Sequence, residues 1–241
     1  MGLEGPLAGV GFGLADREAF PSASLIKVLV LAELLRQADA GLISLEEELV
    51  LWPEDLVEDS EMLGAVSLPA RVSLGGLAGG MITVSDNTAT NGLIRRLGMD
   101  RINALAGGLG LRRTSLRREM MDFEARSRGE ENTTSASDMV ALMREIWAGP
   151  GLTRESRELA LGLLLGQRLV PSITFPTPPG ARYAHKTGEL DGVENDAGLL
   201  LVPGRSFALA VLVEGDVGRA VGPVSGALRV LCGFYAGPWR A

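Results

Sequence analysis

Residues 21–40 have the sequence PSASLIKVLVLAELLRQADA. Ser22 is a favourable N-cap for a helix, and Gly41 is a natural end signal. Residues 25–31 are apolar apart from Lys27, and a helix that is hydrophobic on nearly every face is a buried one. The sequence therefore predicts a buried helix here, with one lysine inside its apolar run.

Ser24 and Lys27 are three residues apart, so they share one face of this helix. Ser24 lies in the first turn, where free backbone N–H groups favour developing negative charge. A buried ammonium is costly unless it is paired, and burial lowers its pKa. A lysine that can lose its proton beside a serine hydroxyl would activate that hydroxyl as a nucleophile. The alternative is a lysine that extends along the helix edge into solvent.

Lysine is rare in this chain. Lysine and arginine total 23, and only Lys27 and Lys186 are lysines. Arginine cannot lose its proton at useful pH, and its planar guanidinium cannot replace a compact ammonium. In a chain that uses arginine everywhere else, both lysines are therefore candidates for chemistry.

The remaining pattern divides the chain into a helical middle and a strand-rich end. A short glycine-rich strand is expected at 7–14. Helices are predicted at 87–97, 137–147 and 154–165, and a final helix at 221–235. Alternating segments predict an antiparallel meander at 183–190, 197–202 and 207–213. This order predicts an α+β fold: a discontinuous sheet lobe (1–21 and 173–241), an inserted helical lobe (22–172), and an active site between them.

Ser85-Asp86-Asn87 is a second motif with possible chemistry. All three residue types are good helix caps, so capping is the simpler interpretation, at least for Asp86. A catalytic hydroxyl and a binding amide are the functional alternative, and the two interpretations are compatible.

Lys186-Thr187-Gly188 falls on the first strand of the meander. A lysine and a threonine at a strand end can bind a carboxylate by charge and hydroxyl, and Gly188 permits close approach to the backbone. The alternative is an edge strand with a solvated lysine. His185, the only histidine, points to the opposite face of a strand and is expected to be structural.

Taken together, the chain resembles class A β-lactamases and penicillin-binding proteins, through three motifs in order: Ser24-Leu25-Ile26-Lys27, Ser85-Asp86-Asn87 and Lys186-Thr187-Gly188. The gaps between the motifs also resemble class A spacing. The resemblance implies a β-lactamase/transpeptidase-like α+β fold, an antiparallel sheet flanked by helices with an inserted all-helical lobe.

The resemblance also implies roles. Ser24 would attack the lactam carbonyl, Lys27 would take part in proton transfer, and Ser85 would relay a proton to the leaving nitrogen. Backbone N–H groups of Ser24 and Glu189 would form an oxyanion hole. The residues expected to bind substrate are Asn87, Lys186, Thr187, Gly188 and Glu189.

The deacylating base of class A enzymes is a glutamate on a loop that ends in a Thr-Thr pair. Counting back from Thr133 by the family spacing gives Glu119. Its surroundings depart from the family, since Phe123 replaces an asparagine that helps hold the hydrolytic water and Asn132 replaces the acid that locks the loop. Asp122 and Glu124 are nearby acids that could replace Glu119 in this role. Alternatively, all three carboxylates are solvated loop acids without a catalytic role.

Two further positions depart from the family pattern. Asp59 lies where class A enzymes place an aromatic gate, and Asn195 lies where an arginine is expected after the Lys-Thr-Gly motif. The substrate pocket is therefore not expected to be a standard one.

The first function expected is that of a serine β-lactamase, which would make the chain a hydrolase of antibiotic resistance. A penicillin-binding DD-peptidase or esterase with slow deacylation is the second, and Phe123 favours it. A β-lactam sensor that stays acylated is the third. The expected partner is a small β-lactam or peptidoglycan-like amide, and a monomer is expected.

Bulk properties limit other functions. A chain of 241 residues with a net charge of −7 does not favour nucleic acid or anionic membrane as a partner. No run is long enough for a membrane span, and no metal or other cofactor is indicated. The single cysteine, Cys232, leaves the redox compartment open. The protein would be secreted or periplasmic if a leader has been removed, and otherwise cytoplasmic.

Overall fold

The C-terminal part of the chain forms an antiparallel sheet in a computed structural model, which describes residues 12–236 except 174, 176, 178 and 204. Its strands pair in the order β5 (Arg182–Leu190), β6 (Val193–Val202) and β7 (Arg205–Glu214). The predicted meander is therefore confirmed. Most of the strand expected at 7–14 lies outside the described residues.

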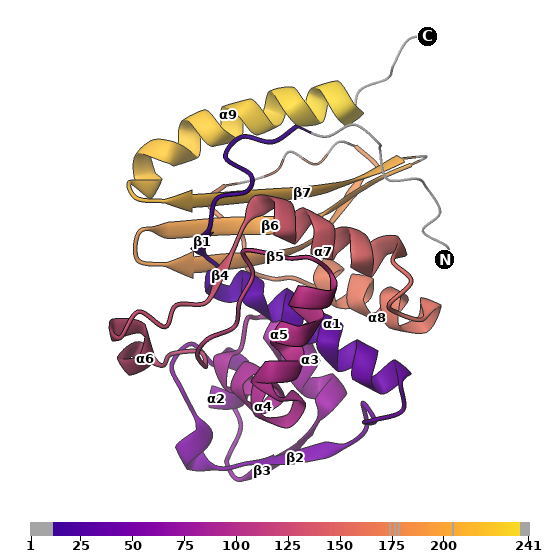
Figure 1. The fold of residues 1–241 in the computed structure, drawn as a ribbon, viewed down its shortest axis with the longest axis vertical. Coiled ribbons are helices and arrows are strands. Elements are labelled where there is room, and N and C mark those ends of the chain that lie inside the picture. The colour runs from indigo at the N-terminus through magenta and orange to yellow at the C-terminus, as the bar shows by residue number, and fades with distance from the viewer. Residues whose placement is uncertain (1–11, 174, 176, 178, 204, 237–241) are drawn as a thin grey trace.

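Helices cover both faces of this sheet (Figure 1). Helix α9 (Val217–Ala236) lies on one face, where a small apolar cluster forms around Leu200, Phe207 and Leu228. On the other face lie α7 (Ala136–Ala148) and α8 (Arg154–Leu165), which contact β7 and β5 respectively. The sheet layer thus draws helices from the middle of the chain as well as from its C-terminal end.

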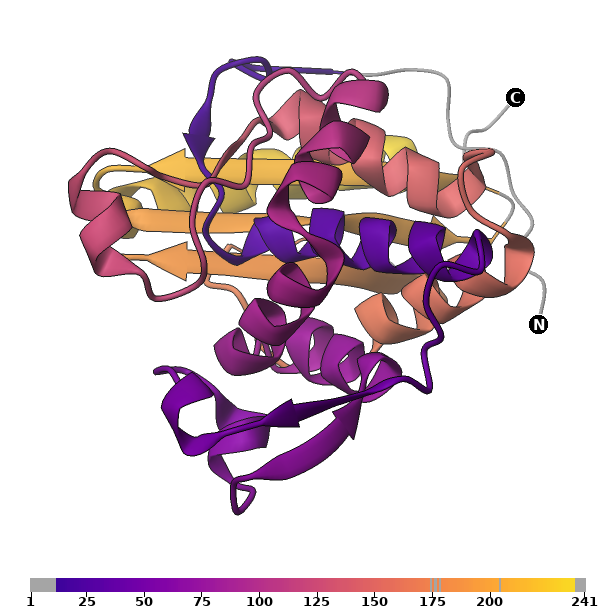
Figure 2. The ribbon, with the colours of Figure 1, turned by 60° about the horizontal axis from the view of Figure 1, so that its bottom comes forward.

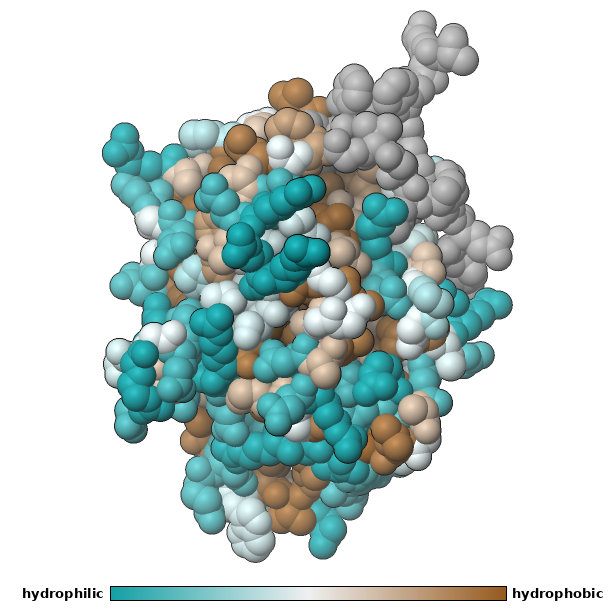
Figure 3. Space-filling model, in the orientation of Figure 1, coloured by the Kyte–Doolittle hydropathy of each residue, from teal (hydrophilic) through white to brown (hydrophobic). Residues whose placement is uncertain are grey.

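The second lobe is helical, and the main apolar core extends from it through the central helix to α7, α8 and the sheet. This lobe is built from α3 (Leu74–Thr83), α4 (Asn87–Leu97) and α5 (Met99–Gly108), with smaller elements at its edge: β2 (Glu48–Leu51), β3 (Ala70–Ser73), η2 (Pro53–Asp55) and α2 (Glu61–Gly64). This arrangement confirms the predicted α+β architecture. Within the described ranges, no helix is long and apolar enough to span a membrane. On the face drawn in Figure 3, hydrophilic and hydrophobic residues are interspersed.

Helix α1 (Ile26–Asp39) runs between the sheet and the helical lobe (Figure 2). Eleven of its 14 residues are buried, as the apolar run in its first turns predicts. Its buried acid, Glu33, accepts hydrogen bonds from Arg36 and Gln37, which satisfies a charge that would otherwise be costly inside the core. The predicted buried helix is therefore confirmed.

The start of this helix differs from the prediction. A short 3-10 turn, η1 (Ala23–Leu25), precedes α1, and Ser22 makes no side-chain capping bond. Ala23 adopts a left-handed conformation (φ 46°), which turns the chain sharply before Ser24. Just upstream, β1 (Phe20–Pro21) pairs with β4 (Thr133–Thr134), so the approach to Ser24 is tied to a distant loop.

Candidate active site

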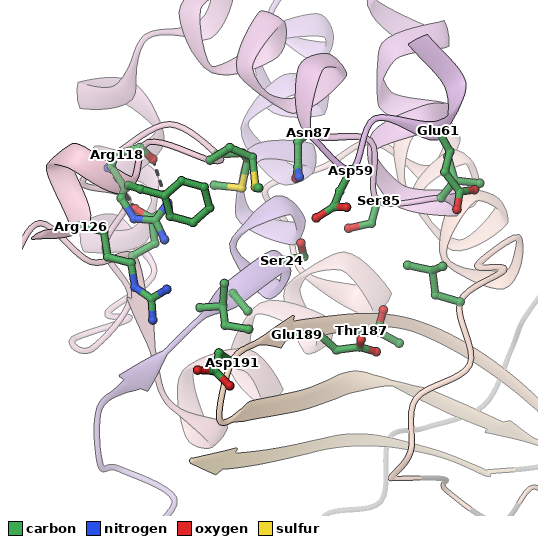
Figure 4. A pocket seen from close by; sticks show the side chains of 18 residues that line it. Ser24, Asp59, Glu61, Ser85, Asn87, Arg118, Arg126, Thr187, Glu189 and Asp191 are labelled. Atoms are coloured by element: carbon green, nitrogen blue, oxygen red, sulfur yellow. Dashed lines mark hydrogen bonds between the residues drawn. The ribbon is translucent and has the colours of Figure 1, made fainter. Parts of the chain in front are cut away.

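A pocket of about 500 Å³ opens between the sheet and the helical lobe (Figure 4). Five of the residues predicted to form a site line it together: Ser24, Ser85, Asn87, Thr187 and Glu189. They come from three segments far apart in the sequence, namely η1, the turn before α4 with the first residue of that helix, and β5. The structure therefore brings the three motifs to one place.

Ser24 lies at the edge of β5 because Gly188 lets the two backbones approach. A Cβ atom at Gly188 would lie 3.1 Å from the Ser22 oxygen and 3.1 Å from the Ser24 nitrogen. Those contacts are with backbone, so a side chain there would displace the turn that carries Ser24. The approach leaves the Ser24 and Glu189 backbones beside each other at the pocket, where the expected oxyanion hole requires them.

Asn195 holds the same turn from the other side. Its Nδ2 donates to the oxygens of Pro21 (2.9 Å) and Ser22 (3.3 Å), and its Oδ1 accepts from the Val213 N–H. Asn195 is fully buried and absent from the pocket lining. This amide therefore anchors the segment before the nucleophile to β6.

Lys27 is completely buried, as expected, but its contacts differ from a direct bond to Ser24. Its Nζ lies 2.7 Å from the Ser85 carbonyl oxygen, 2.9 Å from Ser85 Oγ and 2.7 Å from Asn87 Oδ1. Burial lowers the pKa of Lys27 well below its usual value, and the Lys186 ammonium lowers it further. A neutral amine fits these contacts, since it can donate to the two carbonyl oxygens and accept from the Ser85 hydroxyl.

Lys186 is also completely buried and approaches the same hydroxyl. Its Nζ lies 3.0 Å from Ser85 Oγ and donates to the Thr187 oxygen at 2.9 Å. Burial lowers the pKa of Lys186 to about 7, although the carboxylates of Asp196 and Glu189 act in the opposite direction. Ser85 Oγ therefore lies between two amines, which is the arrangement needed to pass a proton in either direction.

Backbone geometry and a helix start fix Ser85 and Asn87. Ser85 adopts a left-handed conformation (φ 59°), and Asp86 caps α4 by accepting from the Ala89 N–H at 2.8 Å. Strained backbone of this kind often occurs at functional sites. Asn87 Nδ2 donates to the Glu58 oxygen, so this side chain holds both Lys27 and the loop above the pocket.

The loop acids do not join the site. Glu119 pairs bidentately with Arg95 at 2.7–2.8 Å, and Arg95 also contacts Asp55. Asp122 caps α6 (Phe123–Ser127), and Glu124 pairs with Arg128. Each carboxylate thus has a partner away from Ser24, and none of the three lines the pocket.

This loop lines the pocket with three apolar side chains, those of Met120, Met121 and Phe123, beside three polar ones, those of Arg118, Arg126 and Asn132. Two amides fix the loop. Asn91 exchanges two hydrogen bonds with the Met120 backbone, and Asn132 Oδ1 accepts from two successive backbone N–H groups at 117 and 118. An amide at 132 can therefore lock the loop where the family has an acid. The only local signal for Asn91 is its position four residues after Asn87, on one helix face.

His185 lies outside the pocket lining, as expected. Its Nδ1 lies 2.9 Å from Asp196 Oδ1, and its ring stacks on Tyr183. Within the described part of the chain, no cluster of three or more His, Cys, Asp or Glu side chains is arranged to hold a metal ion.

Comparisons with known proteins agree with this geometry. The structure is similar to PBP-A, with 29% sequence identity and a TM-score of 0.82 over 91% of this chain and 83% of that chain. It is similar to a β-lactamase from Sphaerobacter thermophilus DSM 20745 at 28% identity and a TM-score of 0.82, over 94% of this chain and 86% of that chain.

A variant of the class A β-lactamase of the last common ancestor of Gram-negative bacteria gives 25% identity and a TM-score of 0.84, covering 94% of this chain and 88% of that chain. A variant of PBP-A is known as an acyl-enzyme complex with penicillin G. The model of the β-lactamase enzyme family matches residues 8–225. With that match and the shared fold, the chain belongs to the β-lactamase enzyme family.

Proposed function

We propose that this protein forms a covalent acyl-enzyme on Ser24 with β-lactams and peptidoglycan-like amides, and releases the acyl group slowly. The observation that carries the proposal is the combination of a complete acylating group with a loop whose carboxylates all have partners elsewhere. This is the second of the functions expected from the sequence, a penicillin-binding enzyme with slow deacylation. The contacts of the loop carboxylates, which the sequence alone does not reveal, favour it.

Acylation would begin with attack of Ser24 Oγ on the carbonyl carbon. The Ser24 proton passes to the neutral amine of Lys27, while the N–H groups of Ser24 and Glu189 stabilise the oxyanion. No hydrogen bond links Lys27 to Ser24 within the described residues, so the two must close up when substrate binds. Catalytic hydrogen bonds are often long in ligand-free enzymes.

Collapse of the oxyanion would break the C–N bond. The leaving nitrogen takes the Ser85 hydroxyl proton, and Ser85 is reprotonated from Lys27, which regains its neutral state. Lys186 and Thr187 would hold the carboxylate of the substrate, the first by charge and the second by its hydroxyl. Asn87 would contact the side-chain amide of the substrate.

Deacylation needs a water molecule and a base on the far side of the ester. Glu119 is 28% exposed and bound to Arg95, so it is not available for that task without breaking a bidentate pair. The side chains that the same loop contributes to the pocket come from two methionines, Phe123, Asn132 and two arginines, and none of them is a carboxylate or another general base. These observations support slow release of the acyl group.

A β-lactamase is the second candidate, and the similarity to solved β-lactamases favours it. Intact mass spectrometry after mixing with benzylpenicillin separates the two, with Ser24→Ala as the control. A lasting adduct on Ser24 supports the proposal. A brief adduct with continuous penicillin consumption supports the β-lactamase. No adduct and no hydrolysis with several β-lactams would refute both.

A further inference from the structure

The pocket around Ser24 carries an excess of acidic side chains. Four carboxylates and two guanidinium groups line it: Asp59, Glu61, Glu189 and Asp191, with Arg118 and Arg126. Both arginines already pair with Glu131, which lies outside the lining. With Glu131 counted, five carboxylates accompany two guanidinium groups, so the wall keeps an excess of negative charge that faces a ligand.

None of the four carboxylates takes part in a hydrogen bond or ion pair within the described part of the chain. The contrast with the nearby loop is informative, because Glu119, Asp122 and Glu124 all have partners. Four unpaired carboxylates that share one pocket wall favour a ligand that brings the counter-charge.

A second observation concerns the end of β5. Glu189 and Glu194 are direct cross-strand partners in the β5–β6 pair, and like charges in that relation destabilise a sheet. Glu194 is only 6% exposed, and the hydrogen bonds to its carboxylate, from the N–H groups of Ser172 and Ile173, all go to Oε1. Burial raises the pKa of Glu189, and the Glu194 carboxylate raises it further. This pair is therefore an unfavourable arrangement that a bound cation would relieve.

The hollow beside this pair extends the acidic surface. A second pocket of about 350 Å³ shares Glu189, Leu190 and Asp191 with the first and adds two more carboxylates, from Glu194 and Asp216. Glu189 thus connects the acylation site to a compartment whose charged side chains are all acids.

We propose that the substrate of this site carries a primary ammonium group on its acyl part, bound by the carboxylates of Glu189 and Asp191 while its carbonyl faces Ser24. The proposal rests on the acylation of Ser24 proposed above and defines the class of amide or β-lactam that is preferred. An ammonium suits the site because its three N–H donors can contact several carboxylate oxygens at once.

Matched penicillins test this preference. Ampicillin differs from benzylpenicillin by an α-ammonium, and carbenicillin differs from it by an α-carboxylate. At about pH 6.5, we expect the second-order rate constant for acylation of Ser24 to be roughly tenfold higher with ampicillin than with benzylpenicillin. Carbenicillin should be the slowest of the three. Added salt should reduce the ratio, because screening weakens interactions between exposed charges.

Substitutions locate the effect. Glu189→Gln should bring the ampicillin-to-benzylpenicillin ratio close to one, and Asp191→Asn should reduce it in part. Glu158→Gln, which removes one charge from the exposed surface of α8, should leave the ratio unchanged. A purely structural role for Glu189 would change both rates equally and leave their ratio as it is.

The outcomes separate the two proposals. An ampicillin-to-benzylpenicillin rate ratio near one in the parent protein, or a high ratio that persists in Glu189→Gln, overturns the inference. Labelling of Ser24 by benzylpenicillin would still support the proposed function in that case. If no penicillin labels Ser24, the proposed function fails and the inference fails with it.

Discussion

Gly188→Ala perturbs the closest approach in the site. The added methyl would lie 3.1 Å from the Ser24 nitrogen, 3.1 Å from the Ser22 oxygen and 3.2 Å from Ala23 Cβ. Two of these atoms belong to backbone, so the turn that carries the nucleophile must shift by a few tenths of an ångström. Overpacking of this kind costs about 1–3 kcal/mol, and each 1 kcal/mol lowers the melting temperature by about 2–4 °C in a chain of this size.

The effect on acylation should exceed the effect on stability. Complete loss of one oxyanion-hole donor costs about 10²–10³ in rate, which sets the upper limit for a displaced Ser24 N–H. A partial displacement should slow acylation by benzylpenicillin roughly ten- to hundredfold. The assay is the second-order rate of adduct formation by intact mass, with thermal unfolding measured on the same samples.

Gly162→Ala is the matched control, because nothing lies within 4 Å of a Cβ there. That position is inside α8, so alanine should stabilise the protein by about 0.5–1 kcal/mol and leave acylation unchanged. If Gly188→Ala acylates at the parent rate and melts at the parent temperature, the close approach of β5 to the nucleophile turn does not position Ser24.

Three other predictions follow from the site. Burial lowers the pKa of Lys186 to about 7, so its ammonium is present below that pH and lost above it. Acylation by penicillins, which carry a carboxylate, should therefore fall as the pH rises through 7. In a pH–rate profile, an amide that lacks the carboxylate should not show this decrease. Glu119→Gln should leave the lifetime of the acyl-enzyme unchanged, since Glu119 is bound to Arg95, and a longer lifetime by mass spectrometry would contradict this placement. Asn132→Ala leaves two backbone N–H groups without their acceptor and should lower the free energy of unfolding by about 1–3 kcal/mol. Thermal unfolding and faster proteolysis near 117–131 would show this loss. Unchanged values would mean that other contacts hold the loop.

The fold followed from patterns that act over short distances. The apolar run of α1, the alternation in β5–β7 and the cap at Asp86 each express a local preference, and the structure confirms all three. The convergence of the three motifs was expected only through the family resemblance, because nothing local in the sequence places Ser24 beside Ser85.

The remaining details depend on pairings that have no local signal. Glu119 and Arg95 are 24 positions apart, and Lys27 and Asn87 are 60 apart, so neither contact can be obtained from spacing on one element. Ser22 has the right residue type for a cap, yet the left-handed Ala23 redirects the chain before that bond can form. Tertiary contacts determine these three features, and the same features determine the chemistry of the site.

The complete burial of both lysines has a practical consequence for labelling. Each side-chain amine of the chain lies at the interface of the sheet and the helical lobe, with no exposed surface. Reagents and proteases that act on lysine side chains can therefore reach them only when the two lobes separate. The rate at which Lys27 and Lys186 become modified would report the opening of this interface selectively, without any engineered probe, and occupancy of the pocket should slow it.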